Sequence, residues 1–476
     1  MNTDGFDIVV CGDGLAGAMT ALSLVNGLPE THSVQYVRTG RDDQMDALYG
    51  SVTAPTAYDF LRTLGLDEPS LFMRSGTTFC YGTSYQNWPG DRSWMQGYMQ
   101  PFHTIAGVPL VHHLTRGSAA LEPILVSAQA ALHGRFAHPP EDANVPLSRA
   151  EYGYQFSVSD WTDLLDQLIG KSRAITHTAQ FAETLIDAAG TSSIRLQNGD
   201  TLMGDLIVDC SGSQRIVIGK TDSTYESSRS IRAFVRSTPS SQLGWPYRLV
   251  QSNQRGWTSQ THLQSKIETL SIQAANDAER EDGLDASLGH LDAAWRGNCV
   301  AIGQAACTLE PLTPAPMILL QRDIERLLEL IPVSDDLETE RREFNRRFTD
   351  DVAHAALFQD AFYVLPDVPD HEFWQSAVQV GPSAKLKRKL AQFENRGVLV
   401  RFDLEPFNDE DWTILHFGMG RRPRNYDLQV EQIGVEESLK QIGQLKNAIA
   451  QMVPRMPPHH LYVANMKKYF EKQNYA

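Results

Sequence analysis

Gly12, Gly14 and Gly17 follow the spacing Gly-x-Gly-x-x-Gly, which is typical of a turn that binds the pyrophosphate of a dinucleotide. In such a turn the first glycine permits a tight bend, the second lets the backbone approach the phosphates, and the third allows a helix to pack closely on a strand. The free N–H groups at the start of that helix then point at the phosphates. We therefore predict that a dinucleotide contacts Gly12, Gly14, Leu15, Ala16 and Gly17, the alternative being a plain glycine turn.

Two later segments also place small residues directly after a short apolar run. One is residues 207–212 (IVDCSG), and the other is residues 301–312 (AIGQAACTLEPL). Small residues let the backbone come close to a ligand, although each segment alone is equally compatible with a packing turn. Three such segments in this order favour one shared ligand site.

The second predicted strand lacks the acidic residue that usually binds the adenosine ribose. Residues 33–38 (SVQYVR) form this strand and end in Arg38. An arginine there can contact a phosphate or stack on adenine, and it can equally be a solvated surface residue. The change can also weaken dinucleotide binding.

The glycine-rich turns are embedded in alternating strands and helices. Residues 6–11 (FDIVVC) are typical of a strand, the apolar spacing that follows indicates a helix, and a polar loop covers residues 39–46. Similar patterns predict helices at residues 57–66, 161–169 and 317–330, and strands at residues 75–88, 174–177, 193–197, 206–208 and 298–303. Residues 222–292 are predicted as sheet mainly in their first half, and the chain from residue 335 onward as helix.

Charge and composition argue against several classes of protein. The net charge of -16 opposes binding to a phosphate backbone, so we expect no nucleic acid partner. The five cysteines have neither CxxC nor Cys/His spacing, which argues against a disulfide framework and a metal site. We also see no signal sequence and no apolar run near the roughly 18 residues of a membrane span, so we expect a cytoplasmic protein.

Further motifs occur in an order that is found in a known family. Besides the first glycines, these motifs contain Gly50, Thr53, Pro55 and Thr56, then Asp209, Ser211 and Gly212, then Gly303, Glu310, Pro311 and Leu312, then Phe373 and Trp374, and finally Trp412, Gly418, Gly420, Pro423, Tyr426 and Asp427. Over most of its length the chain thus resembles the flavin-dependent tryptophan halogenases, a branch of the two-component FAD monooxygenases.

The resemblance implies a mixed α/β fold, with a Rossmann-like FAD-binding fold of the glutathione reductase and aromatic hydroxylase type, an inserted sheet-containing substrate region and a helical C-terminal region. It also implies FAD as the cofactor, reduced by a separate flavin reductase, and an aromatic or other small molecule as substrate. A homodimer is left open. The implied regions are an FAD-binding region at residues 1–60, 150–221 and 295–334, a substrate or cap region at residues 61–149 and 222–294, and a C-terminal region at residues 335–476.

The same resemblance implies roles for individual residues. In addition to the first turn, the implied FAD contacts are Arg38, Ser51, Asp209, Ser211, Gly212, Gly303 and Pro311. The implied lining of the substrate cavity is Trp257, Phe373 and Trp374, with ordinary core packing as the alternative for these three.

Several positions that carry the family's chemistry differ in this chain. The lysine that passes the halogen to the substrate corresponds to Cys80, and a thiol cannot hold a chloramine or donate a hydrogen bond as an ammonium does. The activating glutamate corresponds to Thr313, which is no general base at neutral pH, and the following Pro314 has no N–H for a halide. Ser51 replaces another glutamate, and only Trp257 remains of a W-x-W-x-I-P motif.

We therefore expect an FAD-dependent monooxygenase or oxidoreductase that resembles the halogenases but does not halogenate. One alternative is a halogenase with a displaced relay, and another is a catalytically silent flavin- or ligand-binding protein. Cys80 is then either a redox-active thiol or a small buried hydrophobe, and Glu310 is either a functional carboxylate or a residue that structures its loop.

Overall fold

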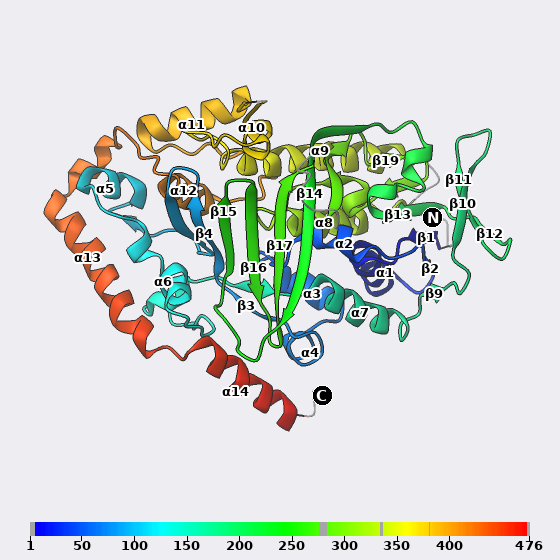
Figure 1. The fold of residues 1–476 in the computed structure, drawn as a ribbon, viewed down its shortest axis with the longest axis horizontal. Coiled ribbons are helices and arrows are strands. Elements are labelled where there is room, and N and C mark those ends of the chain that lie inside the picture. The colour runs from blue at the N-terminus through cyan, green and yellow to red at the C-terminus, as the bar shows by residue number, and fades with distance from the viewer. Residues whose placement is uncertain (1–4, 276–282, 334–336, 380, 474–476) are drawn as a thin grey trace.

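The computed structural model describes residues 5–275, 283–333, 337–379 and 381–473. A parallel sheet near the N-terminus lies beside a larger, mostly antiparallel sheet, and helices from the C-terminal part of the chain run along the outside (Figure 1). Within these ranges, no helix is long and apolar enough to cross a membrane.

The first strand, β1 (Asp7–Cys11), lies inside a six-stranded sheet. It is buried at every position after the first, as expected of an inner strand in a parallel sheet. Neighbouring strands pair in parallel except at one edge, where β19 is antiparallel to β20. This sheet confirms the predicted Rossmann-like region. Its order is β19 (Trp295–Arg296), β20 (Cys299–Ala301), β13 (Leu206–Asp209), β1, β2 (Ser33–Val37) and β9 (Ile175–Thr176).

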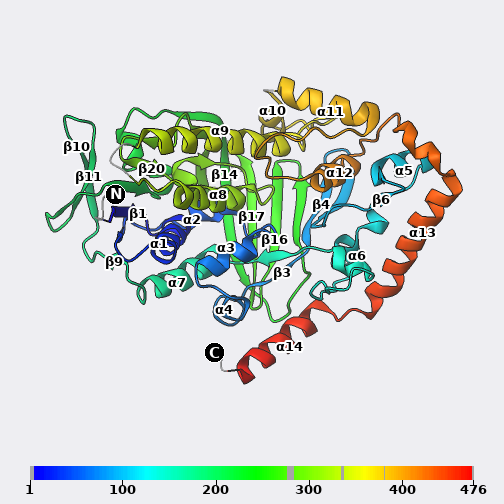
Figure 2. The same ribbon diagram turned by 180° about the vertical axis from the view of Figure 1, so that it is seen from behind.

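Helix α1 (Leu15–Gly27) begins directly after the glycine turn and is buried from Leu15 to Val25. It packs against α7 (Val158–Ile169) and α8 (Ala315–Glu329), which confirms the predicted helices there (Figure 2). The predicted polar loop at residues 39–46 instead ends in a short helix, α2 (Asp43–Asp46). A helix of one turn has no apolar period that a sequence pattern can detect.

The larger sheet has eight strands, and five of them lie in the polar region 222–292. The prediction that only the first half of this region is sheet was therefore too narrow. Its pairs are antiparallel except β15 with β4, which are parallel. The order is β21 (Cys307–Thr308), β18 (Leu284–Leu291), β14 (Tyr225–Pro239), β17 (Lys266–Ala274), β16 (Gly256–His262), β15 (Arg248–Asn253), β4 (Gly82–Trp88) and β5 (Arg92–Gly97).

The single half-buried strand predicted at residues 75–88 is wrong, because two strands occupy this segment. The first, β3 (Thr78–Cys80), pairs with β8 (Gly153–Gln155), and the second, β4, belongs to the eight-stranded sheet. The chain changes sheet at Gly82, whose φ of +139° favours glycine and where a Cβ would overlap the carbonyl of Gln96. Both strands are mostly buried.

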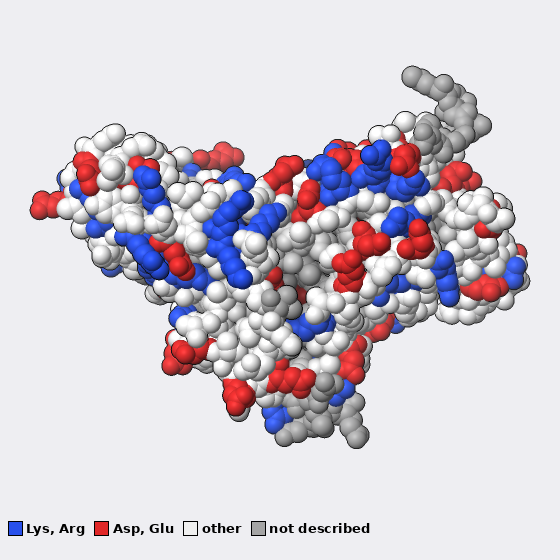
Figure 3. Space-filling model, turned by 90° about the horizontal axis from the view of Figure 1, so that it is seen from above, with Lys and Arg blue, Asp and Glu red and all other residues white. Residues whose placement is uncertain are grey.

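The C-terminal part is helical, as predicted. Helices α13 and α14 form an arm along one side of the molecule, where α13 packs on α5 (Leu110–Gly117) and α14 on α4 (Glu68–Arg74) (Figure 1). Seen from above, basic side chains gather over α11, while acidic and basic side chains are mixed over α9 (Figure 3). The C-terminal helices are α9 (Glu338–Asp360), α10 (Glu372–Gln379), α11 (Ala384–Arg396), α12 (Asp409–Gly418), α13 (Val435–Met452) and α14 (His459–Lys472).

The remaining elements surround the two large sheets. A small sheet at the N-terminal end of the molecule consists of β10 (Phe181–Ile186), β11 (Ser192–Leu196) and β12 (Thr201–Leu202). The others are α3 (Ala57–Thr63), α6 (Val126–Leu132) and the pair β6 (Thr104–Ile105) and β7 (Val108–Pro109).

Candidate functional site

The turn between β1 and α1 has room for glycine only. Gly12 has a φ of +138°, and a Cβ there would overlap the carbonyl group of Cys210. A Cβ at Gly17 would overlap the carbonyl oxygen of Gly12, so α1 packs directly on the turn. The start of α1 borders a narrow crevice. This is the backbone geometry that the pyrophosphate of a dinucleotide requires.

The crevice brings together the first two of the predicted small-residue segments. Asp209 shapes the second segment, since its carboxylate accepts hydrogen bonds from the Ser211 N–H (3.0 Å) and hydroxyl (2.6 Å) and from the N–H groups of Val217 and Ile218 (both 2.8 Å). These hydrogen bonds hold the segment so that Ser211 and Gly212 lie on the wall of the crevice. The lining residues are Asp13, Gly14, Thr39, Gly40, Arg41, Asp42, Met45, Asp46, Cys210, Ser211, Gly212, Ser213, Gln214 and Gln304.

The third predicted segment lies against the same helix. Gly303 has a φ of +66°, and a Cβ there would overlap the hydroxyl of Tyr49 and lie 3.0 Å from the Cβ of Ala16. The next residue, Gln304, donates its N–H to the Tyr49 hydroxyl (3.0 Å) and its side-chain amide to the carbonyl of Met45 (2.9 Å). Segments that are far apart in the sequence thus meet at the start of α1, and their sharing of one ligand stays a prediction.

Asp46 is a residue that the sequence interpretation missed. Its carboxylate accepts a hydrogen bond from the Leu15 N–H (2.8 Å), and a Cβ at Gly14 would overlap it. The side chain is buried, and this burial raises the pKa of Asp46 to about 7. A carboxylate therefore occupies the position at the helix start where a phosphate oxygen would bind. The acidic run Asp42, Asp43 and Asp46 was the available signal.

Two arginines lie near this crevice, and only one of them lines it. The predicted ligand Arg38 has a side chain that is 43% exposed and lies 3.9 Å from the carboxylate of Asp166. Arg41 is the lining residue, with hydrogen bonds to the carboxylate of Asp163 (2.6 Å) and the carbonyl of Ser159 (3.1 Å). The geometry favours the solvated alternative for Arg38, and its role as a ligand stays a prediction.

A cavity of about 470 Å³ lies between the loop before α8 and residues 50–56, the predicted flavin segment, which contains Ser51 and the motif with Gly50, Thr53, Pro55 and Thr56. Its volume falls in the range of small-molecule sites. Ser51, at the start of the flavin segment, makes a hydrogen bond to the hydroxyl of Thr261. The lining residues are Ala54, Pro55, Thr56, Thr83, Tyr85, Gln96, Tyr98, Met99, Glu151, Thr313, Pro314, Ile318, Gln321, Arg322, Glu325, Phe358, Pro406, Phe407, Asn408 and Asp411.

Acidic and amide side chains give this main cavity its polar character. Removal from water raises the pKa of Asp411 to about 7 and also raises the pKa of Glu151. Asp411 accepts a hydrogen bond from the Asn408 N–H (3.0 Å), and Gln96 also lines the wall. A ligand with a hydrogen-bond donor, such as an indole N–H or an amine, fits these acceptors. No sequence pattern had indicated these residues.

Cys80 is fully buried and is not among the lining residues of the main cavity. It packs with Val52 and Tyr98, and its sulfur lies 3.2 Å from the carbonyl oxygen of Gly82. Burial raises the pKa of the Cys80 thiol to about 11, so the thiol is protonated at neutral pH. This geometry favours a small buried hydrophobe over a redox-active thiol.

Arg248 is a second residue that the sequence interpretation missed. It is fully buried, and its guanidinium donates hydrogen bonds to the carbonyl of Pro311 (2.8 Å) and to that of Leu312. In the part of the chain that the structure describes, it pairs with no carboxylate, and its Nε has no partner. Its charge lowers the pKa values of Cys80 and Tyr85, although burial outweighs this effect in both. A permanent cation thus lies beside Cys80.

Glu310 is held in a buried network. It forms an ion pair with Arg229, with side chains that are 4% and 13% exposed, and accepts hydrogen bonds from Tyr363 Oη (2.5 Å) and Trp257 Nε1. The guanidinium of Arg229 lies 5.0 Å from the ring centre of Phe373. Because both carboxylate oxygens are engaged, the contacts favour the loop-structuring role for Glu310.

The three aromatic residues predicted to line a substrate cavity are all fully buried. Trp257 donates a hydrogen bond to Glu310, and Phe373 packs against Arg229. Trp374 donates a hydrogen bond from its indole N–H to the carbonyl of Asn253 (3.0 Å). They are absent from the lining of the main cavity, so their contact with a substrate stays a prediction. Thr313 does line this cavity, and its hydroxyl accepts hydrogen bonds from the Ala315 N–H and the Gln359 amide (both 3.3 Å).

Changing Glu310 to Gln is expected to lower the free energy of unfolding by about 3 kcal/mol, because the buried Arg229 would lose the carboxylate with which it forms an ion pair. Denaturation in guanidinium chloride measures this loss. Glu343→Gln is the control, since Glu343 forms ion pairs with Arg346 and Arg347 on the surface of α9 and should cost less than about 1 kcal/mol. Equal losses in the two variants would contradict the structural role of Glu310.

Comparison with solved structures places this fold among the flavin-dependent halogenases. BrvH from Brevundimonas sp. BAL3 matches with a TM-score of 0.87 and 22% identity, over 96% of this chain and 98% of that one. A flavin-dependent halogenase from Xanthomonas campestris matches with a TM-score of 0.88 and 22% identity, over 97% and 98% of the two chains. These matches confirm the predicted fold class.

The sequence profile of the tryptophan halogenases matches residues 7–434, and the chain belongs to this family. The tryptophan 6-halogenase ThaL of Streptomyces albogriseolus is 22% identical, over 88% of this chain and 90% of its own. The family uses FAD and acts on aromatic substrates. The glycine turn, with Ser211 and Gly212 on the crevice wall, is compatible with the phosphates of FAD, while Gly303 packs against Tyr49 and Ala16 and does not line this crevice. Asp46 opposes the phosphates as long as it stays at the start of α1.

Proposed function

We propose that this protein is an FAD-dependent monooxygenase that receives reduced FAD from a separate reductase and acts on an aromatic small molecule without halogenating it. The observation that carries the proposal is the composition of the main cavity, which contains Thr313 and Pro314 and lacks Cys80. Bound, reduced FAD would react with molecular oxygen. The chain would bind FAD through the turn at Gly12 to Gly17 together with Ser211, Gly212 and Gly303.

The side chains at this site suit binding and orientation more than halogen transfer. A buried, protonated thiol cannot replace an ammonium, and Pro314 offers no N–H to a halide. Asp411 and Glu151 can accept a hydrogen bond from a substrate and fix its orientation in the cavity.

We also propose that three regions of the chain have different roles. Residues 1–60, 150–221 and 295–334 form the FAD-binding region, which is supported by the six strands of the parallel sheet that they contain. Residues 61–149 and 222–294 form the substrate region, supported by seven of the eight strands of the larger sheet, and residues 335–476 add the helical part.

The test combines the protein with a flavin reductase, NADH, FAD, chloride and bromide, and offers indoles and phenols as substrates. We expect products heavier by one oxygen atom, and the use of ¹⁸O₂ should shift their mass by the isotope difference. Mass spectrometry reads both outcomes. A product with a chlorine or bromine isotope pattern would overturn the proposal.

Two other functions are each favoured by one observation. The buried cation of Arg248 beside Cys80 favours a halogenase with a displaced relay. In that enzyme the guanidinium of Arg248 would donate the hydrogen bond that other members of the family donate from the lysine at the position of Cys80. The carboxylate of Asp46 at the start of α1 favours a catalytically silent ligand-binding protein. The same assay separates them, because the first yields halogenated product and the second no product at all.

A further inference from the structure

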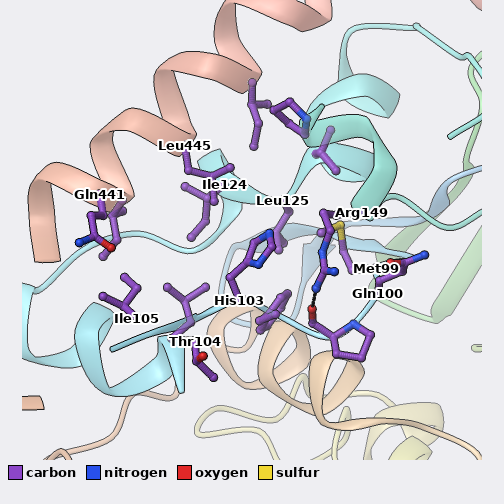
Figure 4. A pocket seen from close by; sticks show the side chains of 17 residues that line it. Met99, Gln100, His103, Thr104, Ile105, Ile124, Leu125, Arg149, Gln441 and Leu445 are labelled. Atoms are coloured by element: carbon purple, nitrogen blue, oxygen red, sulfur yellow. Dashed lines mark hydrogen bonds between the residues drawn. The ribbon is translucent and has the colours of Figure 1, made fainter. Parts of the chain in front are cut away.

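A second cavity, of about 300 Å³, lies next to the main cavity and shares the side chain of Met99 with it (Figure 4). One wall is formed by the loop after β5 and the start of α6, and the opposite wall by α13. The lining is mainly aliphatic and includes Ile105, Leu125, Ile442 and Leu445. A flexible hydrocarbon chain suits such a lining better than a stack of aromatic rings does.

Arg149 provides the permanent charge of this second cavity. Its half-buried guanidinium donates to the carbonyl of Pro101, and within the described ranges no carboxylate pairs with it. His103 lies beside it in Figure 4. Partial burial and the charge of Arg149 lower the pKa of His103, so this ring is neutral at neutral pH. An aliphatic cavity with a single cation is complementary to a molecule with a hydrocarbon body and one acidic end.

We propose that the second cavity binds an aliphatic carboxylic acid, whose carboxylate pairs with Arg149 and whose chain lies between α6 and α13. The planar guanidinium retains donors that its bond to Pro101 does not use, and it can hold a carboxylate with two parallel hydrogen bonds. The acid is either a free molecule or the tail of a substrate that passes Met99 from the main cavity. This site does not depend on the proposed oxidation chemistry.

Isothermal titration of the full-length protein with decanoate tests the proposal. We expect binding of one decanoate per chain, with octanoate weaker by about 15-fold because two methylene groups are no longer buried. Decanol, which lacks the charge, should bind at least about 10-fold more weakly than decanoate. Equal affinity for decanoate and decanol would overturn the proposal.

Variants assign the binding to this cavity. Arg149→Gln should weaken decanoate at least about 10-fold and leave decanol unchanged, and Leu445→Trp should block both by filling the space. Arg135→Gln is the matched control, since the half-buried Arg135 also donates to a carbonyl, that of Met456 (2.9 Å), but does not line the cavity. An Arg149→Gln protein that melts like the unaltered protein and binds decanoate equally well would refute the site.

A decanoate that carries an indole ring at its far end distinguishes the two sources of the acid. If the cavities are continuous, the linked molecule should bind at least about 10-fold more tightly than decanoate, because the ring gains contacts in the main cavity. The acid is then a substrate tail. Equal affinity identifies a free acid, and both results require the same carboxylate site at Arg149.

Discussion

Asp46→Asn is expected to tighten FAD binding by about 10- to 100-fold at pH 8. Asparagine has the same shape and can still accept the hydrogen bond from the Leu15 N–H, but it removes a negative charge from the place where the phosphates must approach. Quenching of FAD fluorescence on titration measures the affinity directly. The readout needs no turnover, so it is independent of the reaction that the protein catalyses.

The affinity for FAD should also depend on pH. Burial raises the pKa of Asp46 to about 7, so the carboxyl group is neutral below this pH and charged above it. FAD should therefore bind more weakly as the pH rises from 6 to 8, and Asp46→Asn should remove this dependence. Since the folded pKa lies above that of the unfolded chain, the stability from this group is present at low pH and is lost as the pH rises through 7.

Asp43→Asn is the control for this prediction. Asp43 lies on the same short helix, but its side chain is 57% exposed and pairs with Arg41 at the edge of the crevice. Its loss should change FAD affinity less than about 3-fold, because solvent screens the charge. If both variants tighten FAD binding equally, the total negative charge near the crevice controls the affinity, and the contact between Asp46 and α1 does not.

Replacement of Arg248 by Met should lower kcat/KM for product formation by at least about 100-fold. The variant removes a buried cation near Gly50 of the predicted flavin segment and frees the carbonyls of Pro311 and Leu312. A nearby positive charge favours reduced flavin, so the reduction potential of bound FAD should fall by some tens of millivolts. Arg248→Lys keeps the charge and should restore most of the potential.

Arg421→Met separates this electrostatic role from simple destabilisation. Arg421 is also largely buried and donates to two backbone carbonyls, those of Ala361 (2.7 Å) and Val364 (3.0 Å), but it lines neither the crevice nor the main cavity. Both variants should lose about 1–3 kcal/mol of stability for each carbonyl left unpaired. Only Arg248→Met should shift the potential. If the reduction potential of bound FAD is unchanged in Arg248→Met, Arg248 serves only to hold the carbonyls of Pro311 and Leu312 in place.

The sequence was sufficient to predict the parallel sheet and its glycine turns, because these depend on backbone geometry. Gly12, Gly17 and Gly303 occupy positions where a Cβ would overlap a neighbouring group, and such positions leave a clear pattern of glycines. The buried strands β1 and β13 are apolar runs that alternate with helices. These local patterns are enough to specify a parallel sheet and the turns at its edge.

The side chains that control the site's charge could not be predicted in this way. Asp46 reaches the start of α1 across 31 positions of sequence, and Arg248 reaches Pro311 across 63. Such contacts depend on how distant segments pack against each other, and the periodic pattern of apolar residues in one segment does not specify this packing. The main cavity is also assembled from distant segments, so Asp411 and Glu151 carried no signal before their neighbours were known.

The position of α13 outside the two large sheets has a consequence for how relatives of this protein can diverge. Ile442, Leu445 and Ile449 form one wall of the second cavity, yet they lie on a helix that lines neither the crevice at the glycine turn nor the main cavity. Substitutions at the half-buried Leu445 can therefore change the shape of the second cavity without changing the residues that line the crevice or the main cavity. In related proteins, the ligand of the second cavity can thus change separately from the cofactor.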